Sequence, residues 1–506
     1  MRRSDKSPHR AFAISLLSVA VAMVGCSGSG GSGPGNGSAA SVAAGDMTSS
    51  GGGNGRVSTY TVSATVTGLT GQGLVLQLNG GQDQSVLADG SVTFPSGLMT
   101  GASYTVTVST QPAMRREICG VTNGSGMIGQ ANVTDVAINC SNVDGFLYQI
   151  TFSNQLFSYG LSAGTGVPVP FGTPLATGTN PLALVTAPGG KFLYLDVPLG
   201  DQGPGSISVY AVNPDTGILT AVSSFTTTGL NPALMVMSPG GGFLFVLGGP
   251  WPAMSGSALV TYAVNAATGA LTPTGTSLTF DVASAPSALA VTPDGKFLYL
   301  LGGVFNSGTP APITLTAYAI DPTSGTLTAG PVLRWINYDT SAGGATMAID
   351  PLGRFLYLAR GQGDSNYAAA TVLPYAINAD SGALTPIGSG TPVASNAGAM
   401  TVDPTGRYLY VVNDLNSNAA NDTVLALAID QSSGVVSPLG SPQETAGPAE
   451  TIICDRSGRF VYLGTDFTAS SLASFAINTA PSTAGQLVPS GQTGPSGETM
   501  ALAIVE

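Results

Sequence analysis

The sequence is poor in the residue types that enzymes most often use for acid–base chemistry and for holding metal ions. It has one histidine, His9, and only 8% of its 506 residues are charged, against roughly 25% in an average domain. A chain with no histidine after position 9 lacks the usual ligands for zinc, and it contains no Asp-x-Asp-x-Asp loop for calcium. We therefore expect neither a metal site nor a cofactor.

The first 25 residues have the pattern of an export signal. Basic residues at positions 2, 3, 6 and 10 precede the apolar stretch 11–24, which is shorter than the roughly 20 residues that span a bilayer. The segment Met23-Val24-Gly25-Cys26 resembles the lipobox of bacterial lipoproteins. That resemblance implies a lipid on Cys26, and Ser27 after it favours the outer membrane of a Gram-negative bacterium. An ordinary signal peptide cleaved nearby is the alternative.

Acidic residues outnumber basic ones once this segment is set aside. Residues 1–25 hold four of the 15 Lys and Arg and one of the 27 Asp and Glu, so 11 basic and 26 acidic residues remain. Such a charge balance repels a phosphate backbone, so we expect no nucleic-acid partner. The expected partners are the membrane, reached through Cys26, and an unidentified envelope protein or small molecule. We expect the folded part to be monomeric.

Three cysteines follow Cys26. Cys119 and Cys140 lie 21 residues apart in a β-rich stretch of an exported chain, which favours a disulfide over two free thiols. Cys454 ends the apolar run 451–454. We interpret it as a small buried side chain rather than a nucleophile.

Composition changes twice before the longest part of the chain begins. Residues 26–55 hold Cys26 and a Gly/Ser/Ala-rich tether, whose r.m.s. reach would be about 30 Å. Residues 56–142 then show short alternating β-branched and aromatic runs, separated by turns such as Asn79-Gly80-Gly81 and Asp89-Gly90. This pattern predicts a small β-sandwich domain.

A short phrase recurs seven times in residues 143–506: an aromatic anchor, an aliphatic residue and usually a second aromatic. The anchors are Phe146, Phe192, Phe243, Phe297, Phe355, Tyr408 and Phe460. Successive anchors lie 46 to 58 residues apart, and each unit holds four strand-like segments. Four strands at such a period are typical of a β-propeller blade. We expect the anchors themselves to pack between blades as core residues.

The two ends of this region are predicted to share one blade. The unit of Phe146 lacks the strand that precedes the other anchors, and residues 498–505 form an orphan strand at the C-terminus. Combining them closes a ring of seven blades and removes open sheet edges. The predicted fold is therefore all-β, a seven-bladed β-propeller preceded by a small β-sandwich domain.

Two phrases carry a family resemblance. Pro-Asp-Gly-Lys-Phe-Leu-Tyr-Leu at 293–300 and Asp-Pro-Thr-Gly-Arg-Tyr-Leu-Tyr-Val-Val-Asn at 403–413 resemble the repeats of the lactonase-type seven-bladed propeller family. That family includes bacterial 6-phosphogluconolactonases and fungal muconate-lactonizing enzymes. The resemblance implies a ligand funnel on one face, with a Pro-Arg-His run at inner-strand starts and carboxylates nearby. No Arg-His pair occurs in this chain.

Polar residues at the corresponding funnel positions are the candidate site. The catalytic candidates are Glu450, Glu498, Asp414 and Arg360. The two glutamates are interpreted as occupying equivalent places in adjacent blades, as a paired-carboxylate site. The ligand-binding candidates are Asn413, Asp364, Asp196, Asp466 and Trp251. The alternatives are a solvated rim of polar loop residues and a Trp251 buried under its own loop.

These residues favour binding over hydrolysis. Lactone hydrolysis needs a base for water and a cation or donor for the oxyanion, and without histidine the base would have to be a carboxylate. Three of the 11 basic residues precede residue 143, and six are placed in turns on the face away from the funnel. That leaves Arg334 and Arg360, too few to hold a sugar phosphate. We predict an envelope lipoprotein whose lactonase-like propeller binds a partner or small ligand. The alternatives are a lactone hydrolase using funnel carboxylates and a structural or adhesion scaffold.

Overall fold

The described part of the chain is built of strands. The computed structural model describes residues 58–113, 116–199, 204–227, 229–250, 257–280, 286–302, 313–335, 346–360, 370–393, 396–414, 422–445, 447–467, 471–495 and 497–506. Within these residues every regular element is a strand, which confirms the predicted all-β class. None of them forms a helix that could cross a membrane.

The first unit consists of two main sheets packed face to face and a short two-stranded sheet of β1 and β6. One sheet has the order β4-β3-β7-β9, and β2, β5, β8 and the first half of β10 form the other. Alternate residues such as Val62, Leu76 and Ile138 fill the core between them, as the period of two along each strand requires. The strands are β1 (Thr59–Tyr60), β2 (Val62–Thr67), β3 (Leu74–Leu78), β4 (Gly81–Val86), β5 (Gly90–Thr93), β6 (Leu98–Met99), β7 (Ser103–Thr110), β8 (Glu117–Thr122), β9 (Ser125–Met127) and β10 (Val133–Thr151).

One long strand joins this sandwich to the propeller. The first half of β10 pairs with β2 and β8. Its second half pairs with β11 (Gln155–Ser162) from Val143 and with β39 (Gly497–Val505) from Phe146. The predicted boundary between residues 142 and 143 therefore falls inside a continuous strand. Cys119 and Cys140 face each other across β8 and β10 and form the predicted disulfide, which is thereby confirmed.

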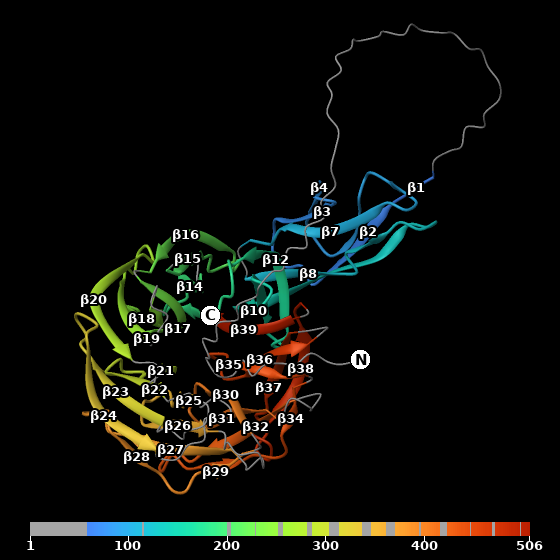
Figure 1. Ribbon diagram of the computed structural model, residues 1–506. Coiled ribbons are helices and arrows are strands. Elements are labelled where there is room, and N and C mark those ends of the chain that lie inside the picture. Colours follow the sequence, from blue (N-terminus) through green and yellow to red (C-terminus); the bar gives the residue numbers. More distant parts are fainter. Residues whose placement is uncertain are drawn as a thin grey trace, which may run out of the picture.

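Seven four-stranded blades form a closed ring (Figure 1). Blade 1 comprises β39 (Gly497–Val505), β10, β11 (Gln155–Ser162) and β12 (Pro168–Ala176). Blade 2 comprises β13 (Leu184–Thr186), β14 (Phe192–Val197), β15 (Ser206–Val212) and β16 (Leu219–Thr226). Blade 3 comprises β17 (Leu230–Met237), β18 (Phe243–Pro250), β19 (Ser257–Val264) and β20 (Leu271–Phe280). Blade 4 comprises β21 (Pro286–Val291), β22 (Phe297–Gly302), β23 (Ile313–Ile320) and β24 (Leu327–Trp335).

The remaining blades follow the same plan, with short extra strands at two outer edges. Blade 5 comprises β25 (Thr346–Ile349), β26 (Phe355–Arg360), β27 (Thr371–Ile377), β28 (Leu384–Pro386) and β29 (Thr391–Pro392). Blade 6 comprises β30 (Asn396–Val402), β31 (Tyr408–Asp414), β32 (Thr423–Ile429), β33 (Val436–Pro438) and β34 (Gln443–Glu444). Blade 7 comprises β35 (Ala449–Cys454), β36 (Phe460–Phe467), β37 (Leu472–Ile477) and β38 (Leu487–Thr493).

The ring closes as the sequence predicts. The C-terminal β39 is the inner strand of blade 1 and pairs antiparallel with β10, from Phe146 opposite Val505 to Ile150 opposite Ala501. In Figure 1 the red β39 lies between the green-blue β10 and the red strands of blade 7. Because no peptide segment joins β39 to β10 directly, backbone pairing and side-chain packing must hold this joint.

The aromatic anchors pack between blades, as predicted. Each anchor ring lies against a glycine in the turn between the third and fourth strands of the next blade. In blade 5, for example, Gly382 has φ of +70°, and a Cβ added there would lie 2.7 Å from a ring carbon of Phe297. Tyr299 also donates a hydrogen bond to the Gly382 carbonyl at 2.8 Å.

We expect Gly382→Ala to destabilise the protein by more than the roughly 1–2 kcal/mol that a left-handed alanine costs, because the added methyl also displaces Phe297. Gly388→Ala is the matched control, since Gly388 has φ of +66° and open space around it. Urea unfolding of the two variants measures the difference. Equal losses of stability would show that the ring contact contributes nothing.

Candidate functional site

The candidate site lies on the face of the ring where the second strands end and the inner strands begin, which we call the funnel face. Three of the predicted site residues have described side chains there: Asp196, Asn413 and Glu498. Their places in the strands bring them to this face. Asp196 and Asn413 are the next-to-last residues of β14 and β31, and Glu498 is the second residue of β39.

Asp196 is a fully buried carboxyl with one unused oxygen. Its Oδ1 accepts hydrogen bonds from the backbone N–H groups of Leu182 and Ala183, both at 2.8 Å. Its Oδ2 is buried and has no hydrogen-bond partner. The other six blades have an aliphatic residue or glycine at this position, four residues after the anchor. The carboxyl is therefore the polar exception of the repeat.

Burial decides the protonation state of Asp196. Loss of solvation raises the pKa of its carboxyl to about 8, against the opposing effect of the two backbone hydrogen bonds. Near neutral pH the side chain is thus mostly a neutral acid. In that state it can donate a proton or a hydrogen bond, but it cannot serve as a base for water.

Asn413 is the second buried polar side chain with an unused oxygen. It is 1% exposed, its Oδ1 has no hydrogen-bond partner, and its Nδ2 lies 3.5 Å from the hydroxyl of Thr423. It follows its anchor by five residues and Asp196 follows its anchor by four. Because side chains alternate along a strand, the two point to opposite faces of their blades.

The structure corrects the predicted equivalence of Glu450 and Glu498. In blade 7, Glu450 is the extra residue of a β-bulge between Ala449 and Thr451. In blade 1 the same bulge falls between Thr499 and Ala501, so Met500 is the counterpart of Glu450. Glu498 lies two residues further along, because β39 continues past the bulge and pairs with β36 of blade 7.

The register gives Glu498 a different neighbour from the predicted one. Its Cα partner is Asp466 at the end of β36, and its carbonyl accepts a hydrogen bond from the N–H of Phe152. The Glu498 side chain is half-buried. The joint of blades 1 and 7 therefore brings two acidic positions into register on the funnel face.

Comparison with known proteins agrees with this architecture. The profile of the family described as "Lactonase, 7-bladed beta-propeller" matches residues 169–283 and 365–501. The chain belongs to this family. No curated protein matches it closely enough to count as a relative.

Solved structures show the same fold at low identity. A proposed 6-phosphogluconolactonase from Bacteroides fragilis is 18% identical with a TM-score of 0.55, over 72% of this chain and 98% of that one. The corresponding protein from Bacteroides uniformis is 16% identical with a TM-score of 0.56, over 71% and 99%. The periplasmic gluconolactonase of Pseudomonas aeruginosa is 19% identical with a TM-score of 0.54, over 72% and 99%.

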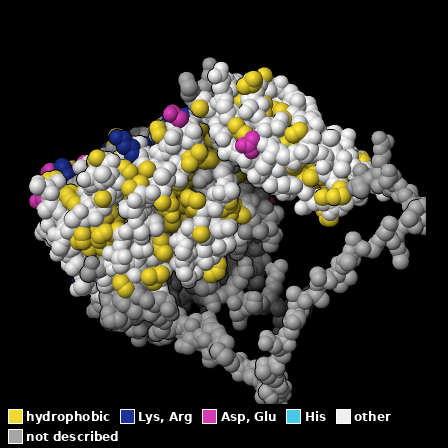
Figure 2. Space-filling view, turned by 90° about the horizontal axis from the view of Figure 1, so that it is seen from above, with side chains coloured by type: hydrophobic (Ala, Val, Ile, Leu, Met, Phe, Trp, Pro, Cys, Tyr) yellow, Lys and Arg dark blue, Asp and Glu magenta, His cyan; other side chains and the backbone are white. Residues whose placement is uncertain are grey.

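The basic side chains described in this lactonase-family propeller lie mostly on the face opposite the funnel. Arg354 forms an ion pair with Asp350 at 3.1 Å, and both Arg354 and Lys296 donate to turn carbonyls of the following blade. Arg459 pairs with Asp144. The edge-on view of Figure 2 shows Lys and Arg side chains along one rim of the ring. These basic side chains connect neighbouring blades and lie away from the funnel face.

A buried polar cluster at the same joint was not predicted. Gln149 donates to the hydroxyls of Thr499 and Ser471, at 2.6 and 2.8 Å, and accepts from Tyr159 at 2.7 Å. The other six blades have Leu or Val at the position of Gln149, three residues after the anchor. That interruption of the repeat was the available signal. Since each of these bonds is internal, the cluster fastens blade 1 to blade 7 rather than offering free groups.

The other candidates remain predictions. Arg360, Asp414, Glu450 and Asp466 lie at strand positions on the funnel face, but their side chains are outside the described set. Asp364, Trp251 and Cys26 lie outside the described residues altogether. Among the residues that are described, no group of three acidic, cysteine or histidine side chains could hold a metal ion.

Two further features carry no site chemistry. Cys454 is half-buried, and loss of solvation raises the pKa of its thiol, which disfavours a thiolate.

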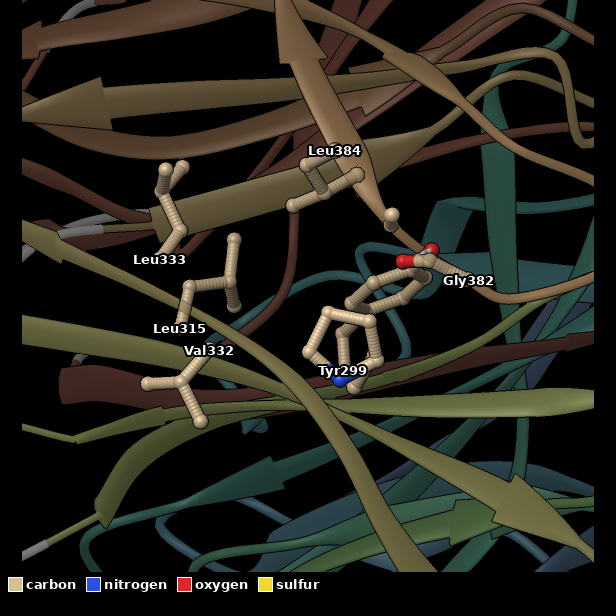
Figure 3. Close-up of a pocket in the computed structure, with 9 residues that line it drawn as sticks. Tyr299, Leu315, Val332, Leu333, Gly382 and Leu384 are labelled. Carbon is tan, nitrogen blue, oxygen red and sulfur yellow. Dashed lines mark hydrogen bonds between the residues drawn. The ribbon is translucent and has the colours of Figure 1, made fainter.

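A gap of about 70 Å³ lies between blades 4 and 5 (Figure 3). It is surrounded by Leu315, Val332, Leu333 and Leu384, beside Tyr299 and Gly382. Its lining is mostly apolar and belongs to the packing between blades.

We expect Asp196→Asn to become more stable relative to wild type as pH rises from 5 to 8. In this range the unfolded carboxyl is ionised while the buried one is still protonated, so the stability that Asp196 contributes at acid pH is lost toward its folded pKa of about 8. Thermal unfolding at several pH values measures the trend. Asp430→Asn is the control, because hydroxyl and backbone donors of Ser432 and Ser433 lower the pKa of Asp430 and its difference should be flat in this range. If the wild type instead became more stable relative to Asp196→Asn as pH rises, the raised pKa of Asp196 would be contradicted.

Proposed function

We propose that this lactonase-family protein is a cell-envelope lipoprotein whose funnel binds a small ligand or partner without hydrolysing it. The observation that carries the proposal is the division of charge between the two faces. Six of the eight propeller cations lie in turns opposite the funnel, Arg334 lies exposed on the outer strand of blade 4, and the chain has no histidine beyond position 9. Burial raises the pKa of the described funnel carboxyl Asp196 to about 8, so near pH 7 it is mostly protonated and poorly suited to act as a base.

A lactone hydrolase is the second candidate, and two observations favour it. The register sets Glu498 opposite Asp466, and Arg360 ends β26 on the same face. Two acidic positions and one arginine are the residue types that such a reaction needs as a base and as an oxyanion partner. The fold is also shared with a protein named as a gluconolactonase, although an identity of 19% supports the fold alone. A structural or adhesion scaffold is the third candidate, and it needs no funnel chemistry.

Turnover of lactones distinguishes the first two candidates. We expect that the protein purified without residues 1–26 does not hydrolyse sugar and acyl lactones faster than buffer alone. Titration in a pH-stat measures the rate of hydrolysis. Hydrolysis that falls at least tenfold in Glu498→Gln or Glu450→Gln would overturn the binding proposal. Asp380→Asn is the matched control, because Asp380 is an exposed carboxyl in a turn on the opposite face.

The lipid anchor can be tested separately. If Cys26 carries acyl chains, the wild-type chain expressed in a Gram-negative host should enter the detergent phase in a Triton X-114 partition, and Cys26→Ser should move to the aqueous phase. Cys454→Ser should leave the partition unchanged. A wild-type protein in the aqueous phase, with a mass lacking acyl groups, would contradict the anchor and leave an ordinary signal peptide.

A further inference from the structure

The joint between β39 and β10 is bridged differently from the contacts between several other blades. In blades 4, 5 and 7 a Lys or Arg directly before the anchor donates to a carbonyl in the turn of the next blade, whereas blade 3, like blade 1, has a glycine there, Gly242. Lys296 donates to Ala379 at 3.4 Å, Arg354 to Gln431 at 2.9 Å, and Arg459 to Ala163 at 3.0 Å. These acceptors are equivalent residues, each the second of its turn.

Blade 1 has no room for a cation at this place. Its residue before the anchor is Gly145, and a Cβ there would fall 2.8 Å from the carbonyl oxygen of Val505 and 2.8 Å from Glu506. The close neighbours belong to the end of β39, which lies against β10 in place of a connecting turn. A side chain at position 145 would therefore push the closing strand away.

Arg116 of the sandwich domain occupies the missing position. Its Nε donates to the carbonyl of Pro214 at 3.0 Å, and Pro214 is the turn residue of blade 2 equivalent to Gln431. Its guanidinium carbon lies 5.9 Å from the ring centre of Phe146, as that of Arg354 lies 5.0 Å from Phe355. Both contacts of a blade cation are thus reproduced by a residue from another domain.

Neighbouring residues hold Arg116 in register with blade 1. A second guanidinium nitrogen of Arg116 donates to the carbonyl of Asp144 at 3.0 Å. Ile118 is fully buried in the core of blade 1 together with Phe146. The Cys119–Cys140 disulfide then fixes β8 to β10 one residue further on. The edge of the sandwich is therefore built into the blade that closes the ring.

We propose that the sandwich domain clamps the joint of β39 and β10 that closes the ring, and that its Arg116 supplies the cation that blade 1 itself lacks. The clamp does not depend on what the funnel binds. It makes the sandwich a structural part of the propeller, since without Arg116 the joint held by β39 loses the bridge that blades 4, 5 and 7 make with their own cations.

Native-state hydrogen exchange of the protein from residue 27 onward tests the clamp. We expect Arg116→Met to speed exchange of the β39 amides by roughly tenfold, the size of one hydrogen bond to a charged group, with little change in blades 3 to 5. Lys296→Met is the matched control, because it removes the same bridge from a blade whose strands are covalently connected. It should leave β39 unchanged.

Arg116→Lys covers the case in which Arg116→Met does not fold. A lysine makes the single bridge to the turn carbonyl in blade 4, so Arg116→Lys should fold. Because it keeps the charge and one bridge but loses the second bond, to Asp144, exchange of the β39 amides should be faster than in wild type by less than tenfold. The proposal is overturned if β39 exchanges at the wild-type rate in Arg116→Met, or if all seven blades accelerate equally. It is also overturned if Arg116→Lys fails together with Arg116→Met.

Discussion

The whole propeller depends on one contact, the seat of an aromatic anchor on a left-handed glycine of the next blade. The anchor and glycine pairs are Phe146 with Gly217, Phe192 with Gly269, Phe243 with Gly325, Phe297 with Gly382, Phe355 with Gly434, Tyr408 with Gly485 and Phe460 with Gly166. In four blades the second aromatic, a tyrosine, also donates to that glycine's carbonyl. Because each seat links one blade to the next, the seven seats together run around the whole ring.

This seat also separates structure from possible chemistry. The anchors, the glycines and the blade cations all lie toward one face, where the repeat has to keep the same residue types. The second strands leave that constraint as they approach the funnel face. There the sequence departs from the other blades at Gln149, Asp196 and Asn413, and all three are buried polar side chains. Non-repeating residues, rather than the repeated phrase, are therefore where this chain can differ from its relatives.

The same distinction explains what the sequence could predict. Seven blades, closure by β39, core anchors and the disulfide follow from local periods and spacings, and the structure confirms them. The predicted equivalence of Glu450 and Glu498 was wrong, because β39 continues past the bulge that both blades share and Glu498 lies two residues from the counterpart of Glu450. The contact of Arg116 with the Pro214 carbonyl joins two residues that lie 98 positions apart in the chain. Neither a bulge nor such a contact leaves a mark in the repeat itself.

Contact distances along the chain imply an order in which this joint can form. Gln149 bonds to residues 322 and 350 positions away, so the closing cluster must wait for the C-terminal strand. The sandwich and its disulfide involve much shorter separations. Since loop closure costs more for distant contacts, we expect the sandwich to fold first and to present Ile118 and Arg116 to β10. Blade 1 would then stand partly formed, with one edge open, until β39 arrives to fill it.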